Sequence, residues 1–240
     1  MVEKIKGIIL AGGLGTRLLP MTKITNKHLL PIYDKPMIYY PINTLKSLGI
    51  DNIMIITGPE SCGHFVELLS DGSEFNVNLT YKVQKGPTGI AGALSLAEEF
   101  VGDERCAVIL GDNIFQKPIE KLKKFKDNET LVFIKKVSDP GRFGVAEIKN
   151  GKIIDIIEKP KKPKSDYIVA GLYIYPSNVF DMIRKIKPSK RGELEITDVD
   201  NIYAKKGLLK FQKIIGGWSD AGTVNSLLQA SEMIKNENTI

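Results

Sequence analysis

The stretch Leu10-Ala-Gly-Gly-Leu-Gly-Thr-Arg17 follows directly on the apolar run Lys6-Gly-Ile-Ile-Leu10. A short apolar run that ends in glycines predicts a buried strand leading into a loop. Glycines in such a loop let backbone N–H groups approach phosphate oxygens closely, and Thr16 and Arg17 add a hydroxyl and a fixed cationic fork. The loop lacks the Gly-Lys-Ser/Thr of a Walker A motif, and it lacks the third glycine of the dinucleotide fingerprint because Leu18 stands there. A phosphate-binding loop of another kind is therefore expected, and a dehydrogenase is disfavoured.

Strand and helix patterns alternate through the first half of the chain. Helices are expected over residues 36–48, 65–69, 89–100 and 118–126, and strands over 6–10, 52–57, 77–83 and 107–110. This alternation predicts parallel strands joined by right-handed crossovers, with helices on both faces of the sheet. Ligands should gather at the carboxyl ends of these strands.

From Thr130 onward the sequence is richer in strands, with a tight hairpin expected at Asn150-Gly151. Strands are expected over 131–137, 144–148, 153–157, 168–175 and 209–214, and helices over 177–186, 197–205 and from Thr223. Neither a linker nor an internal repeat interrupts the pattern. The sequence therefore predicts a single α/β domain over residues 1–240, Rossmann-like, with a mostly parallel mixed sheet flanked by helices.

Composition and charge exclude several classes of protein. The chain has 240 residues, 34 Lys+Arg against 28 Asp+Glu and a net charge of +6, all ordinary for a globular protein. The densest basic cluster, Lys159 to Lys164, is interrupted by prolines and carries no aromatic residues, so a nucleic-acid partner is disfavoured. No apolar run approaches the roughly 20 residues of a membrane span. No membrane partner and a cytoplasmic location are expected, since the first apolar run is also too short for a secretory signal.

The two cysteines do not indicate a metal centre. Cys106 lies within an apolar run, which predicts a buried, inert thiol. Cys62 and His64 lie close together, but one further His and one further Cys cannot easily complete a four-ligand zinc site. Structural zinc is therefore not expected.

Further motifs recur along the whole chain after the glycine-rich loop and Lys27. They are Leu29-Leu-Pro-Ile-Tyr-Asp-Lys-Pro-Met37, Tyr81-Lys-Val-Gln84, Leu110-Gly-Asp-Asn-Ile-Phe115, Phe143-Gly-Val145, Glu158-Lys-Pro160, Gly171-Leu-Tyr173, Arg191-Gly-Glu-Leu-Glu-Ile-Thr-Asp198 and Trp218-Ser-Asp-Ala-Gly-Thr223. In content, order and spacing this set resembles the sugar nucleotidyltransferases, or sugar-nucleotide pyrophosphorylases, and their thymidylyltransferase branch in particular. The resemblance covers essentially the whole chain.

The resemblance implies transfer of a deoxythymidylyl group from dTTP to α-D-glucose 1-phosphate, giving dTDP-glucose and pyrophosphate. Magnesium is the implied cofactor, and the dTDP-rhamnose pathway is the implied setting. Elementary chemistry agrees, because an anionic sugar phosphate must attack an anionic α-phosphate and the site has to cancel charge. Residues 1–129 would mainly bind the nucleotide and residues 130–240 mainly the sugar phosphate.

The same resemblance assigns roles to individual residues. The implied catalytic residues are Arg17, Lys27, Asp112, Lys159 and Asp220, of which Asp112 and Asp220 would hold magnesium. The implied nucleotide-binding residues are Leu10, Gly12, Gly13, Gly15, Thr16, Arg17, Lys27, Gln84, Pro87 and Gly89. The implied sugar-phosphate-binding residues are Asn113, Gly144, Glu158, Lys159 and Val169.

Three features depart from the family pattern or leave alternatives open. His28 stands where many longer members carry Gln, which puts a titratable ring near the expected triphosphate site without an assigned role. Phe143 replaces a frequent Tyr and removes one hydroxyl from the sugar side. Longer members continue into an added helical region, so dTDP-rhamnose feedback at a secondary site is not expected.

The alternatives are the same chemistry with UTP or another hexose 1-phosphate, and a noncatalytic nucleotide-sugar sensor. The sensor is disfavoured because the five implied catalytic residues occur together. The sequence leaves room for a homo-oligomer.

Overall fold

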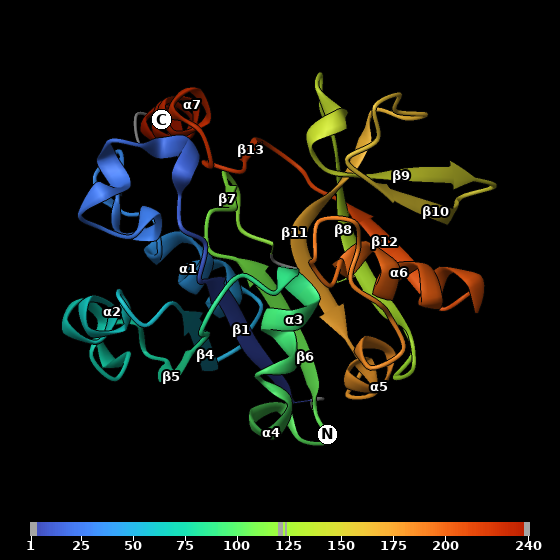
Figure 1. Ribbon diagram of the computed structural model, residues 1–240, viewed down its shortest axis with the longest axis horizontal. Coiled ribbons are helices and arrows are strands. Elements are labelled where there is room, and N and C mark those ends of the chain that lie inside the picture. Colours follow the sequence, from blue (N-terminus) through green and yellow to red (C-terminus); the bar gives the residue numbers. More distant parts are fainter. Residues whose placement is uncertain (1–3, 120–121, 123, 238–240) are drawn as a thin grey trace. The chain divides into compact units, whose positions relative to one another are not determined.

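The computed structural model describes residues 4–119, 122 and 124–237 of the chain. Their contacts cluster in two compact units. The N-terminal unit comprises Lys6–Pro87, Ile109–Lys121 and Ile215–Ile240, and the central unit comprises Met1–Ile5, Thr88–Val108 and Leu122–Ile214. Figure 1 labels the elements of both units.

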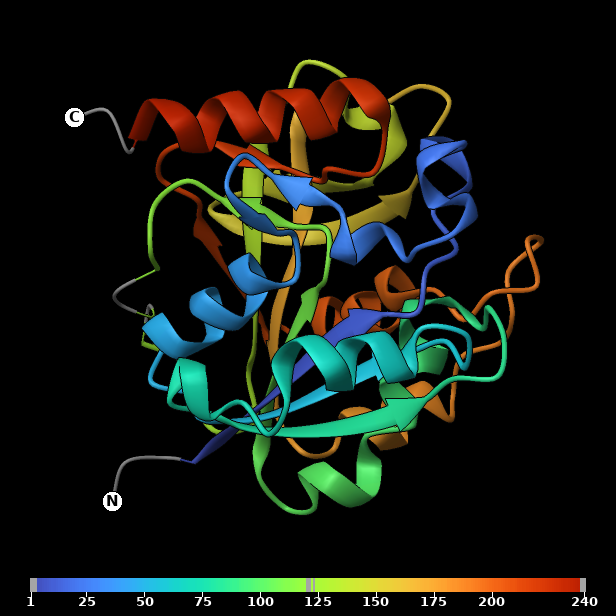
Figure 2. The ribbon, with the colours of Figure 1, turned by 90° about the vertical axis from the view of Figure 1, so that its left-hand side faces the viewer.

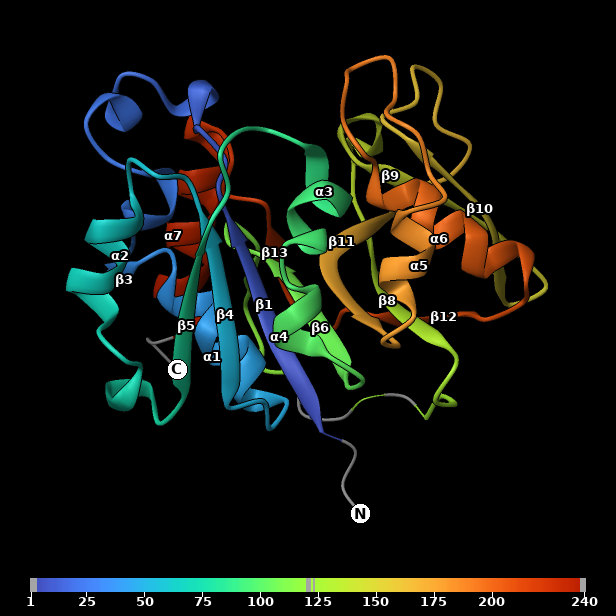
Figure 3. The ribbon, with the colours of Figure 1, turned by 60° about the horizontal axis from the view of Figure 1, so that its bottom comes forward.

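The N-terminal unit is built on parallel strands. β1 (Ile5–Ala11) pairs in parallel with β4 (Asn52–Thr57), which pairs in parallel with β5 (Asn78–Val83), and Figure 3 shows the three side by side. On the other side of β1 lies the end of β6 (Arg105–Leu110), where the Gly111 N–H donates to the Leu10 carbonyl at 2.9 Å. β1 and β4 are buried along almost their whole length, which is why they appear in the sequence as unbroken apolar runs rather than as alternating patterns.

Three α-helices lie among the described residues of the N-terminal unit. They are α1 (Tyr39–Ser47), α2 (Cys62–Leu69) and α7 (Val224–Glu237). Figure 2 shows α7 lying over the short hairpin of β2 (Pro31–Ile32) and β3 (Lys35–Pro36). The contact is apolar, because Ile234 and Ala230 of α7 join one buried cluster with Ile32 and Met37. This cluster fixes the chain that follows Lys27.

The central unit is built mostly on antiparallel strands. They are β8 (Thr130–Lys136), β9 (Gly144–Lys149), β10 (Lys152–Glu158), β11 (Tyr167–Tyr175) and β12 (Leu209–Lys213). β9 and β10 form a hairpin, β11 pairs antiparallel with both β8 and β9, and β12 pairs parallel with β8. Asn150 and Gly151 both have positive φ (49° and 70°), the conformation that a two-residue hairpin turn of this kind requires.

The remaining elements are mostly short, apart from one helix of ten residues. They are α3 (Gly89–Ser95), α4 (Glu98–Val101), α5 (Val179–Ile183), α6 (Ile196–Lys205), β7 (Ile114–Phe115), β13 (Trp218–Ser219) and the 3-10 turns Thr16–Leu18, Met21–Lys23, Lys27–Leu29, Ser73–Phe75 and Pro140–Arg142. α6 is pinned to β10 by the Asn201 amide, which donates to the Ile156 carbonyl at 2.7 Å and accepts from the Ile156 N–H at 2.9 Å.

The predicted fold class is confirmed, because the described residues of the N-terminal unit form parallel strands and those of the central unit a mixed sheet, each accompanied by helices. The expected hairpin at Asn150-Gly151 is confirmed as well. The helix expected over 89–100 is instead two helices, since residues 96–97 separate α3 from α4. The helix expected over 118–126 is wrong for the described part of that stretch, because residues 118–119, 122 and 124–126 are not helical; residues 120, 121 and 123 lie outside the described residues. None of the helices among the described residues is both long and apolar enough to span a bilayer.

A buried polar pair lies in the core of the central unit. The Tyr175 hydroxyl donates to Asp200 Oδ1 at 2.6 Å, and both residues are fully buried. Asp200 Oδ2 is buried without a hydrogen-bond partner among the described residues. Burial raises the pKa of Asp200 to about 7, with the nearby charge of Glu158 acting in the same direction and the Tyr175 hydrogen bond opposing it.

Replacing Asp200 with Asn should therefore change how stability depends on pH. The folded state holds the Asp200 proton more tightly than the unfolded chain, so the contribution of Asp200 to stability should be lost as the pH rises from about 4 to about 7. The side chain at position 200 cannot ionise in Asp200→Asn. Between pH 4 and pH 8 the difference in unfolding free energy between variant and wild type should therefore shift in favour of the variant by on the order of a few kcal/mol. Urea unfolding at pH 4, 6 and 8 measures this, with the exposed Asp103→Asn as control. An identical pH dependence in wild type and Asp200→Asn would contradict the assignment.

Candidate functional site

The glycine-rich loop after β1 folds closely around Lys27. A Cβ on Gly13 would lie 3.3 Å from Lys27 Cε, and one on Gly15 would lie 3.0 Å from Lys27 Cβ. Gly15 also has a φ of 65°, a conformation that other residues adopt at a cost. Glycine at these two positions therefore lets the loop backbone approach the lysine stem, which carries the ammonium to the carboxyl end of β1.

The Lys27 ammonium forms an ion pair with Asp112 Oδ2, and it is the central contact of the site. Each side chain is only 13% exposed. Burial alone would raise the pKa of Asp112, but the charge of Lys27 and hydrogen bonds from Lys27 and Asn113 outweigh it. The net effect lowers the pKa of Asp112, so this carboxylate is charged at neutral pH.

Asn113 and Trp218 orient the other oxygen of Asp112. The Asn113 amide donates to Asp112 Oδ1 at 3.0 Å, and the Trp218 indole N–H donates to Asn113 Oδ1 at 2.8 Å. Asn113 is 2% exposed, so its amide is committed to this chain of hydrogen bonds. Trp218 belongs to a motif quoted from the sequence, but its role in holding Asn113 is visible only in the structure.

Asp220 is brought to the same place by two short strands. β13 pairs antiparallel with β7 with Ser219 opposite Ile114, which leads Asp220 toward Asn113. A Cβ on Gly222 would lie 3.0 Å from an Arg17 guanidinium nitrogen and 3.6 Å from Asp112 Oδ2. The N-terminal unit therefore gathers Arg17, Lys27, Asp112 and Asp220 at the carboxyl ends of β1 and β6, as the sequence predicted for ligand sites in such sheets.

The donors in this unit fit a hard divalent cation held partly by substrate. Among the described residues no group of three or more His, Cys, Asp or Glu side chains could hold a metal ion. Mg²⁺ keeps several waters and is bound through one or two carboxylates plus substrate phosphates. Asp112, charged and only slightly exposed, and Asp220, the residue after β13, match that donor set better than they match a cage made only of protein.

A cavity of about 300 Å³ adjoins the glycine-rich loop. Gly12, Gly13, Ser61 and His64 are among the residues that line it. Gln84, at the end of β5, lies beside it, because a Cβ on Gly12 would be 2.8 Å from Gln84 Oε1. The Gln84 N–H donates to the Thr57 carbonyl at 2.8 Å, which continues the parallel pairing of β4 and β5 by one residue.

The remaining residues of the expected nucleotide site divide between the units. Leu10, Thr16 and Pro87 belong to the N-terminal unit, whereas Gly89 belongs to the central unit. There Gly89 has a φ of 81°, and a Cβ on it would lie 2.5 Å from the Leu194 carbonyl oxygen. Glycine is thus required at position 89 by the packing of α3 against the segment before α6, whatever else it binds.

The residues predicted for the sugar phosphate, apart from Asn113, lie in the central unit. Lys159 has a φ of 43°, unusual for a residue other than glycine, and its N–H donates to the Phe143 carbonyl at 3.0 Å. Left-handed backbone at such a residue costs on the order of 1–3 kcal/mol and is common at functional sites. A Cβ on Gly144 would lie 2.8 Å from Thr197 Cγ2 and 3.5 Å from Glu158 Oε2, so Gly144 lies directly beside Glu158.

Glu158 carries an unusual electrostatic environment. Its Oε1 lies 3.4 Å from Lys159 Nζ and 3.6 Å from an Arg191 guanidinium nitrogen. Burial raises the pKa of Glu158, and the neighbouring charge of Glu195 acts in the same direction against Lys159 and Arg191. Arg191 also pairs with Glu195 at 2.8 Å. The sequence motif contained Arg191, but its place beside Glu158 depends on a loop contact that local pattern does not reveal.

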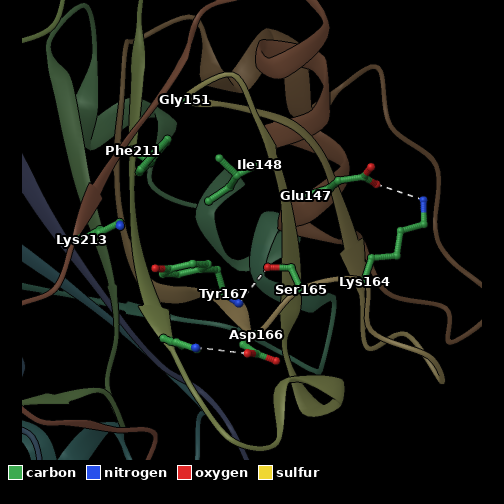
Figure 4. Close-up of a pocket in the computed structure, with 10 residues that line it drawn as sticks. Glu147, Ile148, Gly151, Lys164, Ser165, Asp166, Tyr167, Phe211 and Lys213 are labelled. Carbon is green, nitrogen blue, oxygen red and sulfur yellow. Dashed lines mark hydrogen bonds and ion pairs between the residues drawn. The ribbon is translucent and has the colours of Figure 1, made fainter.

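A larger cavity, of about 660 Å³, lies elsewhere on the central unit. Figure 4 shows Tyr167 and Phe211 in its wall and the Lys164–Glu147 ion pair, 3.0 Å long, at its rim. None of the residues predicted for substrate or metal lines it.

Comparison with solved structures defines the class of protein. A crystal structure from Bacillus anthracis, described as a candidate glucose-1-phosphate thymidylyltransferase, is 51% identical, with a TM-score of 0.90 over 97% of this chain and 96% of that chain. The structure of a UDP-glucose pyrophosphorylase complexed with UDP-glucose is 26% identical, with a TM-score of 0.83 over 98% of this chain and 99% of that chain. The fold is therefore that of the sugar nucleotidyltransferases.

Sequence comparison gives the family. The family model for nucleotidyl transferase matches residues 6–237. The glucose-1-phosphate thymidylyltransferase of Neisseria meningitidis is 45% identical over 96% of this chain and 83% of the relative, and that of Xanthomonas campestris is 47% identical over 96% and 80%. The chain belongs to the nucleotidyl transferase family. Within it the chain is similar to glucose-1-phosphate thymidylyltransferases along nearly its whole length, which confirms the resemblance seen in the sequence motifs.

The contact between Gly12 and Gln84 gives a testable prediction for nucleotide binding. Gly12→Ala would place a methyl group 2.8 Å from Gln84 Oε1 and displace the amide from its present position. If Gln84 recognises the base, loss of one such hydrogen bond should weaken dTTP binding by about tenfold. Calorimetric titration with dTTP measures the effect. Gly63→Ala in α2, where a Cβ would meet nothing within 4 Å, is the matched control. If Gly12→Ala and Gly63→Ala bind dTTP equally tightly, the assignment of Gln84 to base recognition is wrong.

Proposed function

We propose that the protein transfers a deoxythymidylyl group from dTTP to α-D-glucose 1-phosphate, releasing pyrophosphate and forming dTDP-glucose. A phosphate oxygen of the sugar phosphate attacks the α-phosphorus of dTTP, and the bond from that phosphorus to the pyrophosphate oxygen breaks. The observation that carries the proposal is the Lys27–Asp112 pair beside the glycine-rich loop, in a chain 45–47% identical to glucose-1-phosphate thymidylyltransferases.

The residues of the N-terminal unit would cancel the charge of the nucleotide. Arg17 and Lys27 would neutralise triphosphate oxygens and the leaving pyrophosphate, and the glycine-rich loop would donate backbone N–H groups. Gln84 would recognise the thymine edge, since an amide offers one donor and one acceptor group to a base. Charge neutralisation and alignment supply most of the catalysis in phosphoryl transfer.

Nucleotidyltransferases of this kind typically use a divalent metal ion. We propose that the ion is Mg²⁺ and that Asp112 and Asp220 hold it. When bound, Mg²⁺ would withdraw charge from the phosphate oxygens. Lys27 would keep Asp112 ionised and oriented before the ion arrives, because the ammonium lowers the pKa of that carboxyl.

The residues of the central unit would bind the second substrate. Lys159 would bind the attacking phosphate, and Glu158 would accept hydrogen bonds from glucose hydroxyls. The backbone at Gly144 and Val169 would meet the sugar ring, and Asn113 would act through Asp112. Residues 1–129 would thus serve mainly the nucleotide and residues 130–240 mainly the sugar phosphate, in a protein that we place in the cytoplasm.

One alternative substrate has an observation in its favour. A UDP-glucose pyrophosphorylase shares the fold at a TM-score of 0.83 and is 26% identical. UTP could therefore replace dTTP in the same chemistry. The identity of 45–47% to thymidylyltransferases favours dTTP.

Pyrophosphate release tests the proposal. The purified protein with Mg²⁺ would be assayed with dTTP, UTP, ATP, CTP and GTP against several hexose 1-phosphates. Release should be fastest with dTTP and glucose 1-phosphate and should disappear in Asp112→Asn. A preference for UTP would move the assignment to the alternative, and binding of dTDP-glucose without any release would indicate a noncatalytic sensor.

Arg17→Ala should lower turnover by on the order of a hundredfold, the usual loss when one charge-stabilising group is removed. Steady-state kinetics measure kcat, with Lys46→Ala, an exposed cation on α1, as a control whose turnover should match the wild type. Near-normal turnover in Arg17→Ala would refute the role given to this guanidinium.

A further inference from the structure

His28 is buried in the N-terminal unit although it lies next to the partly exposed Lys27. Only 1% of the residue is exposed. It occupies the middle of the 3-10 turn Lys27–Leu29, which Asn26 caps through its side chain. A buried polar ring needs hydrogen-bond partners to offset its desolvation, so its contacts indicate what it does.

Asn26 holds one edge of the His28 ring. The Asn26 Nδ2 donates to the Ala11 carbonyl at 3.2 Å, and its Oδ1 accepts from the His28 backbone N–H at 2.9 Å. A carbonyl only accepts and a backbone N–H only donates, so these two bonds fix the amide orientation. His28 Nδ1 lies 2.7 Å from the same Oδ1 and therefore carries a proton and donates it. The ring is thus tied through Asn26 to the carboxyl end of β1.

The opposite edge of the ring presses against the main chain of Gly111. A Cβ on Gly111 would lie 2.6 Å from His28 Cδ2 and 3.0 Å from His28 Nε2. The Gly111 N–H in turn donates to the Leu10 carbonyl. The imidazole therefore fills the space above the carboxyl ends of β1 and β6, and a side chain at position 111 would have no room.

These contacts lie one residue away from the central ion pair on each side. Lys27 immediately precedes His28, and Asp112 immediately follows Gly111. Burial lowers the pKa of His28 to about 3, helped by the charge of Lys27 and opposed by Asp112 and the Ala11 carbonyl. The ring therefore adds volume and one hydrogen bond, but no charge, to a region where Lys27 must remain available to phosphate.

We propose that His28 is a positioning residue whose ring, braced between Asn26 and the Gly111 backbone, sets the position of Lys27 and Asp112 for the nucleotide. The inference rests on the proposed function, and it deepens that proposal by assigning a residue to the geometry of the nucleotide side. A shift of about 1 Å in groups of this kind can cost on the order of a hundredfold in rate.

The first test compares His28→Ala with His28→Phe. Ala removes the ring and the hydrogen bond, whereas Phe keeps a planar ring against Gly111. His28→Ala should weaken dTTP binding in EDTA by about tenfold or more, raise KM for dTTP and lower kcat, and leave KM for glucose 1-phosphate unchanged. His28→Phe should recover part of the dTTP affinity.

A stability-matched control separates positioning from simple loss of folding. Leu45→Ala empties a fully buried site on α1, where Leu45 packs near Gly7 at the opposite end of β1. It should lower the unfolding temperature without changing dTTP affinity. A His28→Ala protein that loses activity only in proportion to its unfolded fraction, with normal dTTP affinity, would overturn the proposal.

A second test uses the Gly111 contact directly. Gly111→Ala should weaken dTTP binding, because its methyl group would collide with the ring. In the double variant His28→Ala/Gly111→Ala the collision with the ring is absent and only the Leu10 carbonyl oxygen, 3.1 Å away, remains close to the methyl group. The dTTP affinity of the double variant should therefore exceed the value expected from adding the two single effects. If the losses of dTTP affinity in the two single variants simply add in the double variant, the proposed contact between the His28 ring and Gly111 does not position the site. If the wild type itself binds no dTTP, the proposed function fails. If the wild type is active and the His28 variants keep its dTTP affinity and activity, only the role proposed for His28 is refuted.

Discussion

The ion pair between Lys27 and Asp112 joins two segments that lie 85 residues apart in the chain and end side by side at the edge of the sheet. Removing two charges from water is costly, and the cost is offset only where geometry and further hydrogen bonds are good. The Asn113 amide supplies such a bond to the carboxylate and is itself held by the Trp218 indole, and the glycine-rich loop gives the lysine stem room. The result is a cation and an anion held in place before any substrate arrives.

Much of this arrangement could be predicted from the sequence, for a physical reason. Strands buried on both faces appear as unbroken apolar runs, and the carboxyl ends of parallel strands lie at one edge. Hence the loop after Leu10 and the carboxylate at Asp112 could be placed together. The turn at Asn150-Gly151 could also be predicted from the sequence, because few residues adopt its backbone conformation.

The remaining details depend on contacts between distant segments, which local pattern does not record. Trp218 reaches Asn113 only because β13 pairs with β7, and Arg191 reaches Glu158 only through the loop before α6. His28 is an intermediate case. Asn26 two residues earlier is a typical N-cap, which signals a local turn, but burial of the ring against Gly111 could not be foreseen. The sequence likewise did not indicate the left-handed backbone conformation of Lys159. The hydrogen bond from the Lys159 N–H to the Phe143 carbonyl supports that conformation.

A double-mutant cycle on Lys27 and Asp112 tests most directly the claim that their pairing organises the nucleotide side before substrate binds. Lys27→Met, Asp112→Asn and the double variant would be compared with the wild type by urea unfolding without ligand. Each single change leaves a largely buried charge without its partner, so the account predicts that the double variant is more stable than the sum of the two losses, by at least about 1 kcal/mol. Strictly additive losses would contradict a preformed pair, and the Lys27 and Asp112 side chains would then act independently.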